Sequence, residues 1–475
     1  MHRVSLNYNS NIIVMSLFKF ESMLKTNNVY FFDLVEFEEI IIHYLDVGKH
    51  SLAKKAVKLG LEQHPASVDL KLLQVELYIF ENDLEKAELQ LKIIERLEPN
   101  NEEVYIQKAT INSKKGFHEE ALINLNKALT YTDDKLDVWS LIGMEYLYID
   151  DFENARLNFA KCLEEDDEDY SSLYNIVYCF DMEEKQEQAI TYLTNFTNRK
   201  PYCEVAWHQL GRQYFILEQY EDALTAFDYA VLIDDSFIGG YLEKAKTLEA
   251  LQQYKLAIEN YLITLELDDP TAFAYLRIGE CYEKIQDFEA AIEYFKKAVK
   301  EDPLLDRGWM LLTDIYYHQK NYQKAAHYIS KAIKIDEDNS LYWKRYAEIN
   351  VQLNFFEEAV SGFNKCLFLK DYALEIYIGL ADVLLFLGEF NDALHLLKKA
   401  QKKHQNCAEI DYRLAGLFFI VNNEKCSFSH LNSALKTDYE YNVILNELFP
   451  SVFNTKQIQK IVTDFKKQSN KLGDF

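Results

Sequence analysis

The apolar residues of this chain fall at helical spacing in short runs that polar breaks separate. In one stretch Trp207, Leu210 and Tyr214 lie three or four positions apart, a polar break follows, and Ala223 and Phe227 resume the spacing. Residues at these intervals share one face of an α-helix. Each stretch therefore predicts two short amphipathic helices that pack antiparallel through their apolar faces.

The same stretch recurs along the chain with a fixed period. Two packed helices need a small residue where their axes approach most closely, and alanine meets that need. Eleven alanines stand 34 residues apart with no insertion or deletion between them: Ala53, Ala87, Ala121, Ala155, Ala189, Ala223, Ala257, Ala291, Ala325, Ala359 and Ala393. An unbroken period of this length indicates one unit repeated in tandem. Counting outward from the alanines predicts twelve repeats over residues 34–441.

The best-formed repeat, residues 204–237, resembles the tetratricopeptide repeat in the order and spacing of its small and aromatic residues. The matching positions are Trp207, Leu210, Gly211, Tyr214, Ala223, Phe227 and Ala230. The resemblance implies an all-α, right-handed superhelix of helix-turn-helix repeats whose first helices line a concave groove. The whole chain looks like long bacterial proteins that consist of such repeats without additional domains. For function, the resemblance implies a non-catalytic scaffold that binds proteins or peptides in this groove.

Residues 1–33 are expected to form an N-terminal tail and capping helix. The segment Ser16–Asn28 predicts a helix in register with the second helix of an incomplete repeat. Residues before Met15 show no packing pattern, so Met15 and Met23 stand beside Met1 as alternative translation starts. A solenoid needs such a cap because its terminal repeat would otherwise expose an apolar face.

Residues 442–475 are expected to form C-terminal capping helices. Residues 442–449 begin a further first helix, which Pro450 ends early because proline disrupts helical hydrogen bonding. A second helix follows Asn454, a predicted N-cap. It carries one apolar stripe backed by lysines, and this stripe consists of Ile458, Ile461, Val462 and Phe465.

The formal net charge of −26 limits the partners that the chain can bind. Such a charge keeps a protein soluble and opposes binding to nucleic acid or to anionic lipid. No apolar run approaches the roughly 18 residues that span a bilayer, and no cleavage site follows the short apolar stretch at residues 11–18. We therefore expect a cytoplasmic protein with no nucleic-acid or membrane partner.

The seven cysteines follow the repeat rather than a disulfide or metal pattern. Cys162 and Cys366 take one small inner position of the repeat, and Cys179 and Cys281 take another. No C-x-x-C and no H-E-x-x-H occurs. The pattern predicts buried, reduced thiols and no metal or cofactor.

Catalytic motifs are also absent from the sequence. There is no G-x-S-x-G, no Walker-type phosphate loop and no G-x-G-x-x-G after a strand-like run. The segments outside the repeats are too short for an enzyme domain, so we expect no enzymatic activity. The acidic run at residues 164–169 lacks the central glycine of an EF-hand. It is interpreted as a solvated inter-repeat loop, with a contact for a basic partner as the alternative.

The resemblance also indicates which residues face a ligand, namely positions 2, 5, 6, 9, 12 and 13 of each first helix. In repeats 5 and 6 these positions include Tyr174, Asn175, Tyr178, His208, Arg212 and Phe215. Further along they include a set of cations, Lys246, Arg277, Arg307, Lys344, Arg345 and Arg413. Such cations favour an acidic segment or a peptide carboxylate, and the aromatic rings supply apolar anchors. Alternatively, the cations pair with the acids at neighbouring positions, Glu243, Glu280, Asp314 and Glu348.

Within this set we expect one pocket across repeats 5 and 6, formed by Tyr174, Tyr178, His208, Arg212 and Phe215. Two other function classes remain open at this stage. An RNA-binding helical-repeat protein of the pentatricopeptide kind needs a basic groove, which the net charge of −26 disfavours. A peptide-sensing transcriptional regulator needs a DNA-binding helix-turn-helix ahead of the repeats, for which the N-terminal segment is too short.

Overall fold

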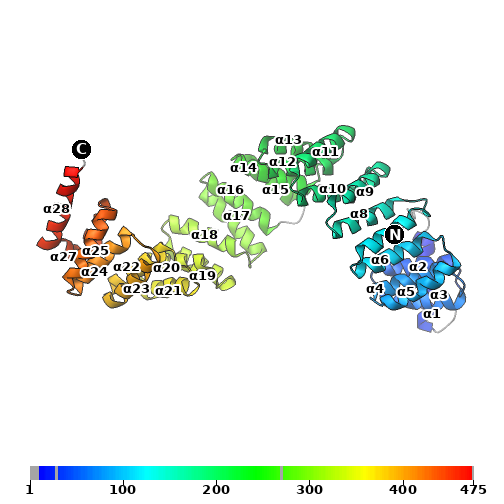
Figure 1. Cartoon of the computed structure of the whole chain (residues 1–475), viewed down its shortest axis with the longest axis horizontal. Coiled ribbons are helices and arrows are strands. Elements are labelled where there is room, and N and C mark those ends of the chain that lie inside the picture. The colour runs from blue at the N-terminus through cyan, green and yellow to red at the C-terminus, as the bar shows by residue number, and fades with distance from the viewer. Residues whose placement is uncertain (1–9, 27–29, 268–270, 473–475) are drawn as a thin grey trace. The chain divides into compact units, whose positions relative to one another are not determined.

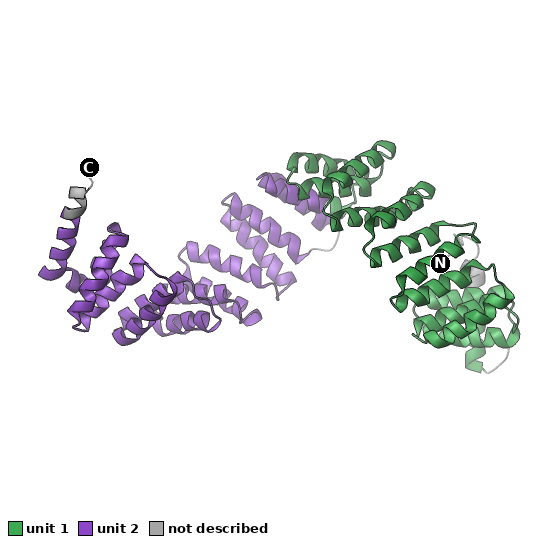
Figure 2. Cartoon of the chain, in the orientation of Figure 1, with its two compact units in different colours: residues 1–240 green, residues 241–475 purple. Residues whose placement is uncertain are grey.

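The computed structural model describes residues 10–26, 30–267 and 271–472 and folds them into helices, with no strand in these ranges (Figure 1). The chain divides into two compact units, residues 1–240 and 241–475 (Figure 2). The first unit contains α1 (Ser10–Thr26), α2 (Leu34–Asp46), α3 (His50–Gln63), α4 (Val68–Phe80), α5 (Leu84–Leu97), α6 (Glu102–Lys114), α7 (His118–Ala128), α8 (Leu136–Tyr148), α9 (Phe152–Glu165), α10 (Tyr170–Met182), α11 (Gln186–Arg199), α12 (Glu204–Ile216) and α13 (Tyr220–Ile233). The division falls within α14 (Ile238–Ala250).

The second unit continues with helices of the same kind. They are α15 (Tyr254–Leu267), α16 (Ala272–Lys284), α17 (Phe288–Glu301), α18 (Asp306–His318), α19 (Tyr322–Ile335), α20 (Ser340–Gln352), α21 (Phe356–Phe368), α22 (Leu374–Leu387), α23 (Phe390–Lys403), α24 (Ala408–Ile420), α25 (Glu424–Thr437), the 3-10 turn η1 (Glu440–Asn442), α26 (Val443–Leu448), α27 (Pro450–Phe453) and α28 (Lys456–Leu472).

Small residues hold the helices together in pairs. In the first unit α2 packs on α3 and so on to α12 on α13, and in the second α16 packs on α17 and so on to α24 on α25. All eleven alanines of the 34-residue series lie on second helices and have no exposed surface. Ser427 takes the place of the next alanine, and its hydroxyl donates to the carbonyl oxygen of Ala415 at 2.7 Å. The predicted all-α class, built from helix pairs, is confirmed.

Each pair turns between its helices through one residue with left-handed backbone. These residues stand 34 positions apart and have φ between 55° and 79°: Gly48, Asn82, Gly116, Asp150, Glu184, Glu218, Gln252, Gln286, Lys320, Asn354, Gly388 and Asn422. The next residue is the N-cap, and the second helix begins one residue later. Asp83 and Asp151, for example, cap α5 and α9 by accepting hydrogen bonds from backbone N–H groups of the first turn.

Tryptophan side chains join three of the repeats to the repeat before them. The indole N–H groups of Trp207 and Trp309 donate to the carbonyl oxygens of Pro201 and Pro303 at 2.9 and 3.0 Å. Trp343 donates in the same way to the carbonyl oxygen of residue 337 at 2.8 Å. A tryptophan at the fourth position therefore satisfies a carbonyl in the loop that precedes its own helix.

The N-terminal helix is longer than the sequence predicts. It begins at Ser10 rather than Ser16, because the apolar stretch before Met15 continues the helix. Its predicted end at Asn28 lies outside the described residues. The side chain of Phe20 is fully buried against α2, with its ring centroid 6.1 Å from that of Tyr44.

The C-terminal segment differs from the prediction in two details. Pro450 stands at the first position of α27, where its missing N–H costs nothing, and α26 has already ended at Leu448. Asn454 closes α27 instead of opening α28, and its side chain donates to the carbonyl oxygen of Pro450 at 2.9 Å. The predicted apolar stripe of α28 packs onto the last core cluster, with Ile458 and Val462 buried.

Candidate protein-binding surfaces

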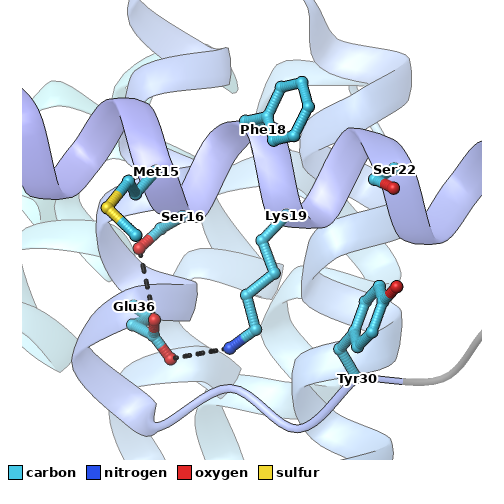
Figure 3. A pocket seen from close by; sticks show the side chains of 7 residues that line it. All are labelled: Met15, Ser16, Phe18, Lys19, Ser22, Tyr30 and Glu36. Carbon is cyan, nitrogen blue, oxygen red and sulfur yellow. Dashed lines mark hydrogen bonds and ion pairs between the residues drawn. The ribbon is translucent and has the colours of Figure 1, made fainter.

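The N-terminal cap contains a hollow of about 540 Å³ between α1 and the start of α2. Glu36 accepts a hydrogen bond from Ser16 Oγ at 3.3 Å and lies 3.8 Å from Lys19 Nζ (Figure 3). Lys19 also donates to the carbonyl oxygen of Phe31 at 2.9 Å. Phe18 points away from this cluster and is exposed. The polar groups therefore hold α1 onto α2, and we assign this hollow no ligand.

A second hollow, of about 370 Å³, opens in the first unit between the first helices α2, α4, α6 and α8. We call it the acidic hollow. Its apolar lining consists of Leu45, Ile79, Phe80, Ile106, Val138 and Leu141. Its charged lining consists of five carboxylates and one ammonium group, on Glu76, Glu102, Glu103, Asp134, Asp137 and Lys114.

Gln107 lies in the wall of the acidic hollow and is only 6% exposed. Its side-chain nitrogen donates to the carbonyl oxygen of Leu72 at 3.3 Å and to Glu103 Oε1 at 2.9 Å. Both partners are acceptors, which fixes the orientation of the amide. Its oxygen, Oε1, accepts no hydrogen bond from any described residue. A buried polar atom without a partner is rare and calls for an explanation.

Lys114 is the one cation among the charged residues that line the acidic hollow. The Nζ of Lys114 donates a hydrogen bond to the carbonyl oxygen of Ile79 at 3.1 Å. Burial raises the pKa of Glu76, and the negative charge of Glu103 raises it further. A raised carboxyl pKa means that the ionised form is disfavoured in this environment, and the positive charge of the chain's N-terminus acts in the opposite direction.

A third hollow, of about 320 Å³, opens in the second unit against the first helices α18, α20 and α22. Its rim carries the rings of Phe356 and Phe386, whose centroids lie 4.2 Å apart. Its two carboxylates, on Glu348 and Asp382, accept hydrogen bonds from arginines of the same unit. This hollow is therefore apolar, with its charges already compensated.

The cations that the sequence predicts for the groove of the second unit are all engaged by carboxylates. The pairs are Lys246–Glu243, Arg277–Glu249, Arg277–Glu280, Arg307–Glu280, Lys344–Glu375, Arg345–Asp314, Arg345–Glu348 and Arg413–Asp382. Arg413 is also 97% buried, with both Nε and Nη2 on the carboxylate of Asp382 at 2.7 and 2.8 Å. The alternative of internal pairing describes this structure, whereas a row of unpaired cations does not.

Arg212 in the first unit differs from that set. Its guanidinium is exposed and donates to Gln209 Oε1 at 3.3 Å, and it forms no ion pair with a described carboxylate. On the preceding first helix, α10, the rings of Tyr174 and Tyr178 are 42% and 48% exposed. Asn175 beside them is half-buried. Two accessible rings and one uncompensated cation are thus presented by adjacent first helices.

The other two residues of the predicted pocket contact the protein itself. The imidazole of His208 packs against the rings of Phe227 and Phe237, with centroids 5.7 and 5.1 Å away. Phe215 packs edge to face on Tyr220 at 5.3 Å. Both residues are half-buried, so they support the surface more than they extend from it.

Cysteines contribute no site to these surfaces. Cys162, Cys179, Cys281 and Cys366 are buried and carry free thiols, as predicted. Burial raises the pKa of the thiols of Cys162 and Cys179 to about 11 and of Cys281 and Cys366 to about 12. A thiol with so high a pKa is unreactive at neutral pH. In the described ranges no group of three or more His, Cys, Asp or Glu residues is arranged to hold a metal ion.

No helix in the described part of the chain combines the length and the apolar character needed to cross a bilayer.

The sequence analysis missed the acidic hollow, although the signal was present. Glu76, Glu103, Ile106 and Gln107 occupy positions 9, 2, 5 and 6 of their first helices, which are among the positions that face a ligand in tetratricopeptide proteins. The unpaired state of Gln107 Oε1 has no sequence signal, because it depends on what every neighbouring group contacts.

Comparison with solved structures gives several partial likenesses. The C-terminal part of a TPR repeat-containing protein from Cytophaga hutchinsonii is 16% identical, with a TM-score of 0.44 over 49% of this chain and 95% of that chain. MamA from Desulfovibrio magneticus RS-1 is 24% identical, with a TM-score of 0.34 over 36% of this chain and 97% of that one. YrrB, described as a TPR protein with an unusual peptide-binding site, is 14% identical, with a TM-score of 0.33 over 37% and 91% of the two chains. Among curated proteins no relative matches.

Family models provide the assignment. Three models of the tetratricopeptide repeat match residues 136–169 and 306–339, residues 272–303, and residues 378–423. Each matched segment is built from the helix pairs described above. Repeats of this family serve in general as non-catalytic scaffolds for protein interactions. The chain is therefore a tetratricopeptide-repeat protein, with the general character of a protein-interaction scaffold.

Proposed function

We propose that this protein is a non-catalytic, cytoplasmic scaffold that binds a protein or peptide segment along its first helices. The observation that carries the proposal is that both units have a hollow on the surface of their first helices. One hollow of the first unit lies between α2, α4, α6 and α8, and one of the second unit lies against α18, α20 and α22. A surface that is hollowed and lined by apolar side chains with a few polar groups is the usual form of a binding site.

Within this scaffold we propose that Tyr174, Tyr178 and Arg212 form one contact site for a partner. Exposed tyrosines provide large apolar area with little loss of conformational freedom, and they are enriched among residues that dominate binding energy. Arg212 can hold a carboxylate in a bidentate pair because its guanidinium has no carboxylate partner within the described chain. A segment with an apolar or aromatic anchor beside an acidic group fits this arrangement.

The remaining predicted residues have a lesser part in this proposal. His208 and Phe215 shape the surface through their ring contacts, and Asn175 is half-buried next to the tyrosines. Lys246, Arg277, Arg307, Lys344 and Arg345 would have to exchange an internal carboxylate for one of the ligand. Such an exchange gains little net free energy, so we propose them as a secondary contribution.

The experiment compares two double variants of the full chain in quantitative capture of cellular partners. Tyr178→Ala with Arg212→Glu removes one ring and reverses one charge at the proposed site. Tyr202→Ala with Arg199→Glu makes the same change on exposed residues at the end of a second helix and in the following loop. We expect the first variant to lose the main partner and the second to retain it, with equal helical content and melting temperature in both.

Equal recovery of the main partner by the two variants would move the site away from repeats 5 and 6. Treatment of the captured material with nuclease tests the RNA-binding class in the same experiment. We expect the recovered proteins to be unchanged by that treatment, because a chain with a net charge of −26 repels phosphate.

A further inference from the structure

We infer that second helices of the second unit bind an acidic protein segment that carries an apolar anchor side chain. The surface lies on α17, α19, α21 and α23, the second helices of four consecutive repeats. Two places in the repeat, three residues apart, define it. The first place holds Lys297, Lys331, Lys365 and Lys399, and the second holds Lys300, Lys334, Phe368 and Lys402. We call this set the lysine face.

The lysine face lies on the side of each helix that points away from the core. Between Lys331 and Lys334 on α19, Ala332 and Ile333 are buried, whereas the two lysines are exposed. Residues three apart share one side of a helix, so the two places form one surface. The other lysines of the face are exposed or half-buried.

Most of these lysines have no carboxylate partner among the described residues. Lys297 pairs with Glu293 at 2.7 Å, and it is the one lysine of the face with an ion pair in the described part of the chain. Helix α19 contains no acidic residue, and Asp336 just after it accepts a hydrogen bond from a loop backbone N–H group at 3.1 Å. The one acidic residue of α23 is Asp392, in its first turn. The face is therefore a local excess of positive charge in a chain with a net charge of −26.

The repeat itself does not require lysine at these places. A cation in the last turn of a helix interacts favourably with the helix dipole, but the effect is confined to that turn. Lys331 and Lys399 each stand four residues before the last residue of their helices, outside that turn. In the first unit the second place holds residues of other kinds, namely Glu62, Arg96, Thr130, Glu164, Asn198 and Leu232. The repetition of lysine is thus a property of these four repeats, and a binding role accounts for it.

Phe368 supplies an apolar contact within the lysine face. It takes the place of a lysine on α21, between α19 and α23 in chain order, and it is 77% exposed. The Nζ of Lys365 lies 5.3 Å from the centre of its ring. A surface that served only to solvate the helices would carry another polar residue here. An exposed ring among polar groups is the usual composition of an interface centre and its rim.

The charges and the ring together specify the occupant. Carboxylates of a partner would pair with lysines that have no partner of their own, and an apolar side chain beside them would cover the ring of Phe368. A protein segment brings such charges over a short length. Nucleic acid and anionic membranes carry their negative charge far beyond the face, and the net charge of −26 repels them.

This inference goes beyond the proposed function, because it concerns second helices of the other unit. Both sites suit an acidic segment, so the experiment must distinguish them. Each measurement is made on the wild-type chain and on the variant Tyr178→Ala with Arg212→Glu, which removes the first-helix site. Either site can then fail its test while the other passes.

The experiment measures binding of labelled synthetic peptides to the purified full chain by fluorescence anisotropy. The probe is a short peptide of glutamates around one central phenylalanine. Two comparison peptides replace either every glutamate by glutamine or the phenylalanine by serine. We expect saturable binding of the probe to both forms of the chain, weaker binding of the serine peptide and no binding of the glutamine peptide. Loss of all binding in the Tyr178→Ala, Arg212→Glu chain would overturn the inference.

Two further variants with the same net charge separate the lysine face from other lysines of the second unit. Lys331→Glu with Lys399→Glu reverses two charges of the face. Lys255→Glu with Lys425→Glu reverses two exposed charges at the starts of α15 and α25. We expect the first variant to bind the probe about tenfold more weakly than the second, because each exposed charge pair contributes a modest free energy. Equal affinities would contradict a site on the lysine face.

Phe368→Ser tests the ring, and the exposure of this side chain means that the fold does not depend on it. We expect the variant to bind the probe and the serine peptide equally. A remaining preference for the probe would overturn the part assigned to Phe368.

Photo-crosslinking of the probe to the wild-type protein needs no variant. Label on α19, α21 and α23 is the expected result, and label confined to the first unit would contradict the inference even if a variant failed to fold. Competition with a single-stranded RNA oligonucleotide of equal charge tests the class of partner. Displacement of the probe at a lower concentration of RNA than of unlabelled peptide would overturn the choice of a protein segment.

Discussion

The ring of Phe227 on α13 lies so close to Gly211 on α12 that a Cβ atom on this glycine would stand 2.6 Å from ring atom Cε1. The same relationship joins Gly143 to Phe159, at 2.7 Å. It recurs one further time between α16 and α17, where a phenylalanine would approach the added Cβ to 2.5 Å. The space that glycine leaves on the first helix is therefore filled by a phenylalanine of the second.

This contact predicts opposite effects for two glycine substitutions in the first unit. Gly211→Ala gains up to about 1 kcal/mol of helix propensity but overpacks the ring, which costs about 1–3 kcal/mol. We expect a net loss of stability. Gly239→Ala adds its Cβ at 3.5 Å from the nearest ring atom, an ordinary contact, so the gain in propensity should prevail.

Hydrogen exchange measured helix by helix checks this prediction. Lower protection of α12 and α13 is expected for Gly211→Ala, spreading mainly to the adjacent repeats because each repeat contacts its neighbours. A variant as well protected as the wild type would show that Phe227 can shift at no cost.

The buried pair of Arg413 and Asp382 predicts a large loss on removal of one partner. Asp382→Ala would leave a guanidinium that is 97% buried without its carboxylate. Breaking such a pair costs about 3–5 kcal/mol, and the lower end applies here because Asp382 is a third exposed. Denaturant unfolding of the full chain, followed at amides of α22 and α24, measures this loss.

The matched control for that pair replaces both partners. Arg413→Met with Asp382→Leu removes the two charges together, so no uncompensated charge remains in the core. We expect this double variant to be more stable than Asp382→Ala alone. The reverse order would mean that the guanidinium finds another acceptor, such as the hydroxyl of Tyr441, now at 3.4 Å.

Truncation after Tyr441 is expected to destabilise the second unit. It removes Phe449, whose ring packs against Gly416, and Ile458, which is buried in the same cluster. The last helix pair would then expose an apolar face, and such faces promote aggregation. Sedimentation and thermal melting check the outcome, and a monomeric product with an unchanged melting temperature would show that the tail is dispensable.

The stability of the second unit should fall as pH rises through the titration of Glu283. Burial, with the nearby charge of Asp314, raises the pKa of Glu283 above its usual 4.5. Below that value the carboxyl is protonated in both states. Above it the unfolded chain releases the proton more readily than the folded chain, so ionisation favours unfolding.

Glu283→Gln is therefore expected to stabilise the protein at neutral pH and to lose this advantage below pH 4.5. Glu259→Gln, on the exposed face of α15, makes the same change of charge without the burial. Melting temperatures of both variants, measured from below pH 4.5 up to neutral pH, test this expectation. A gain of equal size for both variants would reflect only the lower net charge.

The helix pairs could be predicted from the sequence because one residue class at one spacing determines them. Ala223 and its counterparts are required wherever two helices touch, so their period is visible without the structure. The ends of the chain lack that period. The start of α1 at Ser10 and the place of Pro450 as the first residue of α27 depend on local apolar content and on the neighbouring helix, which the repeat does not specify.

The candidate sites could be predicted only in part. Lys246 lies three positions after Glu243 on one helix, so that pair can be read from spacing. Arg413 and Asp382 stand 31 positions apart and meet only because their helices stack. Sequence positions therefore identify which side chains belong to the first-helix surface. Whether each one is available to a ligand depends on contacts between repeats.

The left-handed residue in each turn has a consequence for how the chain can change. Nine of the twelve turns carry an ordinary side chain in a conformation that glycine adopts without strain, as at Glu184 and Lys320. Each such residue costs on the order of 1 kcal/mol, and the turn forms nonetheless. The helices on either side thus impose the bend on whatever residue occupies it. Mutation can therefore change the residue in each of these turns while the helix pairs on either side are kept.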